Sequence, residues 1–287
     1  MAGTLLPGPA DGADARPRRA ARCAAAVAAL AALLSLPACA ARPREAAEAM
    51  PGPPPHGRLV FHDEFDGRAL DERKWDWKYP RPGERAYANP ANGEAQWYRR
   101  ENVSEGNGML TLTARRERTV SPFSGRVFEY TSGLVQSKPS FSFERGYVEA
   151  RVRLPSGSGM WPAVWTWPRS EQWPPEIDLM ELHGNDPEVL RLTYHGPGQE
   201  DSATKVYGSD WSGGWHTVGL EWRRRRLTWY VDGRAERTLP QAPRVPMYLI
   251  ANLAVSNGEE APPPTADTRF PASFEVDYVR VWRLGRR

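Results

Sequence analysis

Short runs of alternating apolar and polar residues, separated by turn signals, constrain the fold of this chain more than any other feature of its sequence. The clearest runs cover residues 109–114, 146–154, 227–231 and 274–282. Successive side chains of a strand point to opposite faces, so each run predicts a strand with one buried face. Turn signals rich in glycine, serine and asparagine fall between the runs, at residues 105–108, 156–159, 212–214, 232–233 and 256–258.

The segment from Leu59 to Trp282 is therefore predicted to be all-β. No window of about a dozen residues outside the N-terminal leader shows the 3.6-residue period of an amphipathic helix. About 230 residues of many short strands fit one β-jelly-roll sandwich of two antiparallel sheets better than two separate domains. We expect this single domain to cover residues 58–287.

Tryptophan is abundant in this segment: the chain has 12, all between Trp75 and Trp282. A core of this size does not need so many. A concave sheet lined with aromatic rings would use the surplus, because sugars present apolar C–H faces that stack on such rings. We expect about half of the tryptophans to line a cleft of this kind and the rest to fill the core.

Residues 1–39 have the pattern of an export signal. A basic stretch from Arg16 to Arg22 precedes small and apolar residues up to Leu36, a stretch too short to span a bilayer comfortably. Residues 36–39 (LPAC) resemble a bacterial lipobox, which would place a lipid on Cys39, and we favour this slightly over cleavage by ordinary signal peptidase. An uncleaved membrane anchor is the third alternative. Residues 40–57 are predicted to be a proline-rich linker.

Cysteine content and charge exclude several functions. The only cysteines, Cys23 and Cys39, lie in the leader, so the exported domain has no disulfide, zinc–thiolate site or cysteine nucleophile. The net charge of +3 falls to about +1 without the leader, which gives no electrostatic reason to expect nucleic acid as a partner. No motif suggests an organic cofactor, and a monomer is the default expectation.

Three acids lie close together within residues 173–184 (WPPEIDLMELHG). In a regular strand Glu176 and Asp178 point to one face, and Ile177 points to the other. Glu181 has the wrong parity, and a one-residue β-bulge after Asp178 would return it to the face of the other two acids. Three carboxyls on one face repel one another unless one is protonated or a cation lies among them.

This crowding has more than one interpretation. A retaining glycosidase needs two carboxyls about 5 Å apart, one to attack the anomeric carbon and one, with a raised pKa, to protonate the leaving oxygen. The same acids could instead lie solvated on a strand edge or bind calcium. The spacing of the acids alone does not separate these alternatives.

Ten motifs in sequence order resemble those of glycoside hydrolase family 16, whose fold is a β-jelly roll with a concave substrate cleft. They span nearly all of residues 59–282, which makes the resemblance specific and favours the glycosidase interpretation of the acids. The matching segments are residues 61–75, 92–98, 130–133, 146–151, 159–165, 173–184, 215–222, 230–233, 252–255 and 276–282.

The resemblance implies a role for each acid. Glu176 would be the nucleophile, Asp178 its electrostatic partner, and Glu181 the general acid and then the general base. Trp215 and Trp222 are expected in the core.

The resemblance also implies substrate-binding residues. Trp161 and Trp165 would line the cleft as sugar platforms near the scissile bond. Asn89 or Asn92, together with His195, would hydrogen-bond the glycone side of the substrate. For His195 a structural role at the end of a strand is the alternative.

Several members of the family hold a structural calcium on the convex face. Asp277 is the matching acid here, with Glu64 and Gly106 as candidate partners. Asp277 could instead pair with an arginine such as Arg280.

The chain departs from the β-1,3-glucan-cleaving branch of the family in its loops. Pro174 and Pro175 precede the first catalytic acid, where a small pair such as Cys-Gly is usual, and residues 256–264 replace a Gly-Gly-Trp segment. Loops and cleft rims set the substrate, so these differences bear on specificity and leave the chemistry unchanged.

We therefore expect a retaining endo-glycosidase that cleaves a polysaccharide, with a β-1,3- or mixed β-1,3/1,4-glucan as the first choice. A galactan-active hydrolase or a transglycosylase of the same family is an alternative. Another is a non-catalytic carbohydrate-binding protein on the same fold, although such relatives usually lack one of the catalytic acids, and this chain has all three.

Overall fold

Two antiparallel sheets hold most of the regular structure. The computed structural model describes residues 57–197 and 202–285. The predicted export signal (1–39), and the predicted linker (40–57) apart from its last residue, lie outside these ranges. Within the described residues no helix has the length and apolar character needed to cross a membrane.

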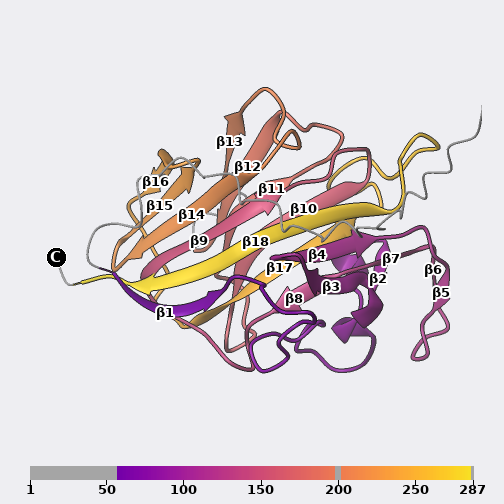
Figure 1. Cartoon of the computed structure of the whole chain (residues 1–287), viewed down its shortest axis with the longest axis horizontal. Coiled ribbons are helices and arrows are strands. Elements are labelled where there is room, and N and C mark those ends of the chain that lie inside the picture. The colour runs from indigo at the N-terminus through magenta and orange to yellow at the C-terminus, as the bar shows by residue number, and fades with distance from the viewer. Residues whose placement is uncertain (1–56, 198–201, 286–287) are drawn as a thin grey trace, which may run out of the picture. The chain divides into compact units, whose positions relative to one another are not determined.

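The larger sheet has eight strands in the order β16-β15-β14-β9-β18-β4-β3, and β1 also pairs with β18. Figure 1 shows the long strands β9, β14 and β18 side by side across the molecule. The strands are β1 (Arg58–Asp63), β3 (Val103–Gly106), β4 (Met109–Ala114), β9 (Gly146–Arg153), β14 (His216–Arg223), β15 (Arg226–Val231), β16 (Arg234–Leu239) and β18 (Ala272–Arg283).

The smaller sheet has six strands in the order β13-β12-β11-β10-β17-β8. They are β8 (Leu134–Gln136), β10 (Met160–Pro168), β11 (Glu176–Leu182), β12 (Val189–His195), β13 (Ser202–Tyr207) and β17 (Met247–Val255). Two small ribbons complete the described strands: β2 (Gln96–Tyr98) with β7 (Tyr130–Ser132), and β5 (Thr119–Val120) with β6 (Val127–Phe128). Helical turns in the described part of the chain are limited to three 3-10 segments, η1 (Gly83–Ala86), η2 (Pro90–Asn92) and η3 (Arg100–Asn102).

The predicted turns join strands as expected, and two of them are two-residue hairpins. Asn107 and Gly108 join β3 to β4 with φ of 55° and 73°, and Asp232 and Gly233 join β15 to β16 with φ of 46° and 74°. Left-handed residues in this position match the twist of the flanking strands, and asparagine, aspartate and glycine adopt the conformation most readily. The all-β prediction is confirmed.

The core lies between the two sheets and follows from the alternation along their strands. On β9, Val148, Ala150 and Val152 are fully buried, while the residues between them are partly exposed. Trp222 is fully buried in this core, as predicted. The prediction for Trp215 is wrong. This residue precedes β14, is only partly buried, and packs against the guanidinium groups of Arg151 and Arg153 at 5.0 and 5.2 Å.

Candidate active site

A bulge in β11 places the three acids together. Glu176 pairs with His195 of β12 and Asp178 with Thr193, but the register then shifts, so that Glu181 pairs with Arg191. The pairing of β11 with β10 is irregular at the same place. The extra residue leaves Leu179 and Met180, which are consecutive, both fully buried. The predicted bulge is therefore confirmed, and Glu181 returns to the cleft side of the strand.

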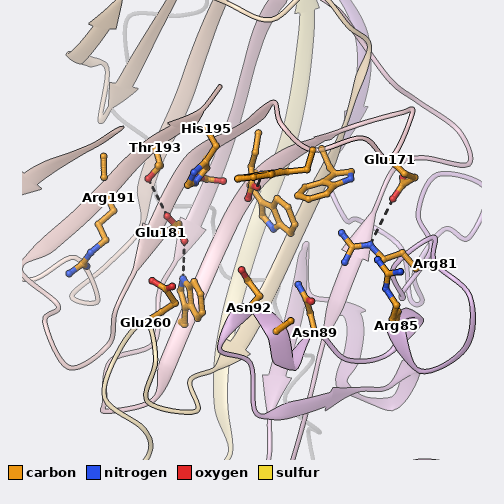
Figure 2. A pocket seen from close by; sticks show the side chains of 18 of the residues that line it. Arg81, Arg85, Asn89, Asn92, Glu171, Glu181, Arg191, Thr193, His195 and Glu260 are labelled. Carbon is orange, nitrogen blue, oxygen red and sulfur yellow. Dashed lines mark hydrogen bonds and ion pairs between the residues drawn. The ribbon is translucent and has the colours of Figure 1, made fainter. Parts of the chain in front are cut away.

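The three acids line one cleft of about 1000 Å³ on the side of the smaller sheet that faces away from the core. Figure 2 shows Glu181, Thr193 and His195 on one side of this cleft, with Asn89 and Asn92 opposite. All five residues that were predicted to bind substrate contribute to its lining: Trp161, Trp165, Asn89, Asn92 and His195.

Glu181 is held by two donors. The indole N–H of Trp161 donates to Oε1 at 3.0 Å, and the hydroxyl of Thr193 donates to Oε2 at 3.2 Å. Trp161 comes from β10 and Thr193 from β12, so the two neighbours of β11 fix the carboxyl from both sides. Burial raises the pKa of Glu181 above its usual range, and these two contacts oppose the increase. A raised pKa is what a proton donor at neutral pH requires.

Glu176, Asp178 and His195 form a second cluster. One carboxylate oxygen of each acid and a ring nitrogen of the histidine lie within 4.8 Å of one another. Nε2 of His195 is 3.3 Å from Oδ2 of Asp178. Glu176 also accepts a hydrogen bond from the indole N–H of Trp173, which reaches Oε2 at 2.8 Å.

The electrostatics of this cluster favour a shared proton. Burial raises the pKa of Asp178 well above its usual range, and the charge of Glu181 raises it further. Burial and the charge of Asp178 raise the pKa of Glu176 as well, whereas His195 and the Trp173 N–H lower it. Asp178 is 3% exposed, and a hydrogen bond with Glu176 and the charge of Arg237 oppose the rise in its pKa. The two acids therefore share a proton at a pH where isolated carboxyls would both be ionised.

Comparison with known proteins agrees with this geometry. The family model for glycosyl hydrolases family 16 matches residues 91–279. The chain belongs to this family. It is 35% identical to the beta-glucanase of Rhodothermus marinus, over 80% of this chain and 86% of the relative. It is 32% identical to the endo-1,3-1,4-beta-glycanase EglC of Rhizobium meliloti, over 78% of this chain, but it spans only about half (51%) of that relative.

Solved structures of the family superpose on the same region. The catalytic domain of an endo-1,3-beta-glucanase (laminarinase) from Thermotoga petrophila RKU-1 gives a TM-score of 0.73 at 30% identity. The match covers 80% of this chain and 99% of that domain. The predicted β-jelly roll is thereby confirmed.

Fewer tryptophans line the cleft of this protein than were predicted from its sequence. Four of the 12 do so, about a third and not a half: Trp161, Trp165, Trp167 and Trp173. The other eight lie elsewhere: Trp75, Trp222 and Trp229, for example, are buried in the core, and Trp215 packs against arginines of β9.

A hydrogen-bond chain below the cleft supports one of these tryptophans. The indole N–H of Trp165 donates to Asn252 at 2.7 Å, and Asn252 donates to the hydroxyl of Tyr98 at 2.9 Å. Tyr98 in turn donates to Glu94, at 3.1 Å, and Gln96 donates to the same oxygen at 2.7 Å. Glu94 is 2% exposed, and its burial raises its pKa. The network fixes the ring of Trp165 in the floor of the cleft.

Sequence reasoning missed several residues of this site. Trp173 escaped notice because it precedes two prolines and looks like a loop residue. Thr193 hydrogen-bonds to Glu181 and Asn252 to Trp165 because their strands lie side by side in the sheet, and the local sequence does not reveal which strands are neighbours. His183 also lines the cleft, and burial lowers its pKa to about 4, so it is neutral at physiological pH.

The residues of the predicted calcium site have other partners. Asp277 accepts a hydrogen bond from Arg151 at 2.9 Å. Arg280 forms a two-pronged pair with Glu64, at 2.9 and 2.6 Å, and Gly106 ends β3 beside the first hairpin turn. Carboxylates already neutralised by guanidinium groups fit a divalent cation poorly. The calcium site stays a prediction, and no step below depends on it.

Proposed function

We propose that the domain is a retaining endo-glycosidase that hydrolyses internal β-linkages of a β-1,3- or β-1,3/1,4-glucan. The observation that carries the proposal is that Glu176 and Glu181 face one cleft on opposite sides of Asp178, each with its own hydrogen-bond donor. Such a pair supplies both groups that retention requires.

In the first step Glu176 attacks the anomeric carbon as a carboxylate, and Glu181 gives its proton to the glycosidic oxygen. The sugar is then bound covalently to Glu176, and the rest of the polysaccharide leaves with a new hydroxyl. In the second step Glu181, now ionised, takes a proton from water, whose oxygen displaces Glu176 from the sugar. When Glu176 attacks as a carboxylate, Asp178 takes the proton that the two acids share, which limits the charge that collects around the nucleophile.

Internal cleavage is supported by the length of the cleft on both sides of the acids. Figure 2 shows Arg191 on one side of Glu181 and the pair Arg81 and Arg85 far on the other. A polysaccharide can therefore extend past the acids in both directions. The glucan preference is supported by the names of the relatives described above, which are glucanases or glycanases.

We also propose that the protein is exported, anchored by a lipid on Cys39 or released after cleavage, and that it acts as a monomer. The basic and apolar leader supports export. Labelling of cells with a radioactive fatty acid tests the anchor, since only the unaltered protein, and not Cys39→Ala, would take up label.

The test of the enzymatic proposal uses purified protein and a panel of β-glucans, galactans and xyloglucan. We expect oligosaccharides from β-1,3-containing glucans, with the β-anomer formed first, as nuclear magnetic resonance would record. Glu176→Gln should lose nearly all turnover and still bind the polysaccharide. Binding without hydrolysis by the unaltered protein would favour the carbohydrate-binding alternative. Products from galactans alone would show that the substrate is a galactan and not a β-glucan.

A further inference from the structure

We infer that the cleft has an anion site at its glycone end, formed by Arg81 and Arg85, which binds a carboxylate carried by the polysaccharide. This inference rests on the proposed function and narrows its substrate to an acidic glucan. Figure 2 shows the two arginines together with Glu171 at the end of the cleft opposite Arg191. Both arginines line the cleft.

The polarity of the cleft follows from the order of the acids. Glu181 protonates the leaving oxygen, so the sugar that leaves lies on its side of the cleft. Glu176 holds the anomeric carbon of the glycone sugar. Glu171 precedes Glu176 in the chain and lies farther from Glu181, so the arginines beside Glu171 contact sugars of the glycone.

Arg81 is held ready to bind an anion. Its guanidinium stacks on the rings of Tyr79 and Trp167, at 5.1 and 5.0 Å, and its side chain is only 13% exposed. Its nearest acid is Glu171, whose Oε2 lies 3.9 Å from Nε, beyond hydrogen-bond distance. Within residues 57–197 and 202–285 the guanidinium donates no hydrogen bond. Packing already holds this guanidinium in place, so it loses little conformational entropy when an anion binds to its free N–H groups.

Glu171 does not neutralise this end of the cleft. Its Oε1 accepts hydrogen bonds from Lys138 at 2.6 Å and from Tyr248 at 3.0 Å, so Lys138 is its closer cation. Arg81 and Lys138 therefore share this carboxylate, and Arg85 adds a positive charge that no ion pair among the described residues offsets.

Arg85 supplies the second guanidinium. It lies on η1, it is exposed, and it has no ion pair among the described residues. Its neighbour Glu84 does not line the cleft, because its carboxylate accepts hydrogen bonds from Ser121 and Ser124. Two guanidinium groups without full counter-charges match the two oxygens of a carboxylate, whereas a neutral glucan would leave their charge uncompensated.

The test compares a neutral β-1,3-glucan with the same polymer partially oxidised to the carboxylate at C6. We expect the unaltered protein to prefer the oxidised polymer at low salt and to lose that preference at high salt. Arg85→Gln should lower the ratio of kcat/KM on the oxidised polymer to that on the neutral polymer by about three- to fivefold, mainly through KM. Arg85→Lys should keep most of the preference.

Arg225→Gln is the matched control, because Arg225 is an exposed arginine in the turn between β14 and β15, away from the cleft. It removes the same charge and should leave the ratio unchanged. An unaltered ratio for Arg85→Gln, or an equal drop for Arg225→Gln, would overturn the anion site. Hydrolysis of neither polymer would refute the proposed function and this inference with it, whereas hydrolysis that ignores the carboxylates would refute this inference alone.

Discussion

Replacing Trp173 by phenylalanine isolates the hydrogen bond that supports the nucleophile. The indole N–H of Trp173 donates to Oε2 of Glu176 at 2.8 Å, and it opposes the rise in the pKa of Glu176 that burial causes. Phenylalanine keeps an aromatic ring at the rim of the cleft but has no donor. Trp173 is therefore a positioning residue that favours the ionised form of Glu176.

The size of the effect follows from the length and exposure of this bond. A hydrogen bond to a charged group contributes about 1.5–3 kcal/mol. Trp173 is 50% exposed, so water competes for Glu176 and the net contribution falls below this range. A loss of about 1 kcal/mol corresponds to about fivefold in kcat. The acidic limb of the pH profile should also move to higher pH, because the pKa of Glu176 rises when the donor is removed.

The assay is the pH dependence of kcat and KM on a soluble β-glucan. Trp215→Phe provides the control, since Trp215 packs on Arg151 and Arg153 of the other sheet and does not line the cleft. The reasoning is wrong if Trp173→Phe raises KM and leaves both kcat and the pH profile unchanged. Trp173 would then be a sugar platform only.

Three further predictions test the site and its support. Glu181→Ala should lose about a thousandfold in kcat on glucan and much less on aryl glycosides with good leaving groups, which need no proton; equal losses on both substrates would exclude an acid role. Asp178→Asn should be more stable than the unaltered protein at pH 7, because burial raises the Asp178 pKa above its usual 3.8 and the folded state must hold a proton that the unfolded state releases. This gain in stability should vanish below pH 3.8. Chemical denaturation of both proteins at pH 7 and below pH 3.8 measures it, and an equal difference in stability at the two pH values would contradict a raised pKa for Asp178. Tyr98→Phe should lower the free energy of unfolding by about 2 kcal/mol, since Glu94 and Asn252 each lose a buried partner; chemical denaturation measures this, and a loss near zero would mean that water replaces the hydroxyl.

The catalytic strand could be predicted from its sequence because its information is local. Parity along β11 assigns Glu176 and Asp178 to one face, and the parity error at Glu181 identifies the bulge. Turn residues with left-handed conformations are equally local, as at Asn107 and Gly108.

The supporting contacts could not be predicted in this way, because their partners come from distant segments. Asn252 of β17 contacts Tyr98 of β2, more than 150 residues earlier, only because both pack beneath the cleft. Trp215 was misplaced for a related reason. The sequence does not reveal that the outward arginines of β9 cover its ring.

The bulge in β11 and the number of residues between the acids depend on each other. Leu179 and Met180 both point inward, so the strand segments before and after them are out of phase by one residue. Deletion of Met180 would remove the extra residue, and regular alternation would then keep the proton donor on the face of Glu176 and Asp178 without a bulge. A chain with two residues between the middle acid and the proton donor therefore needs the bulge, whereas a chain with one residue there would reach the same arrangement in a regular strand.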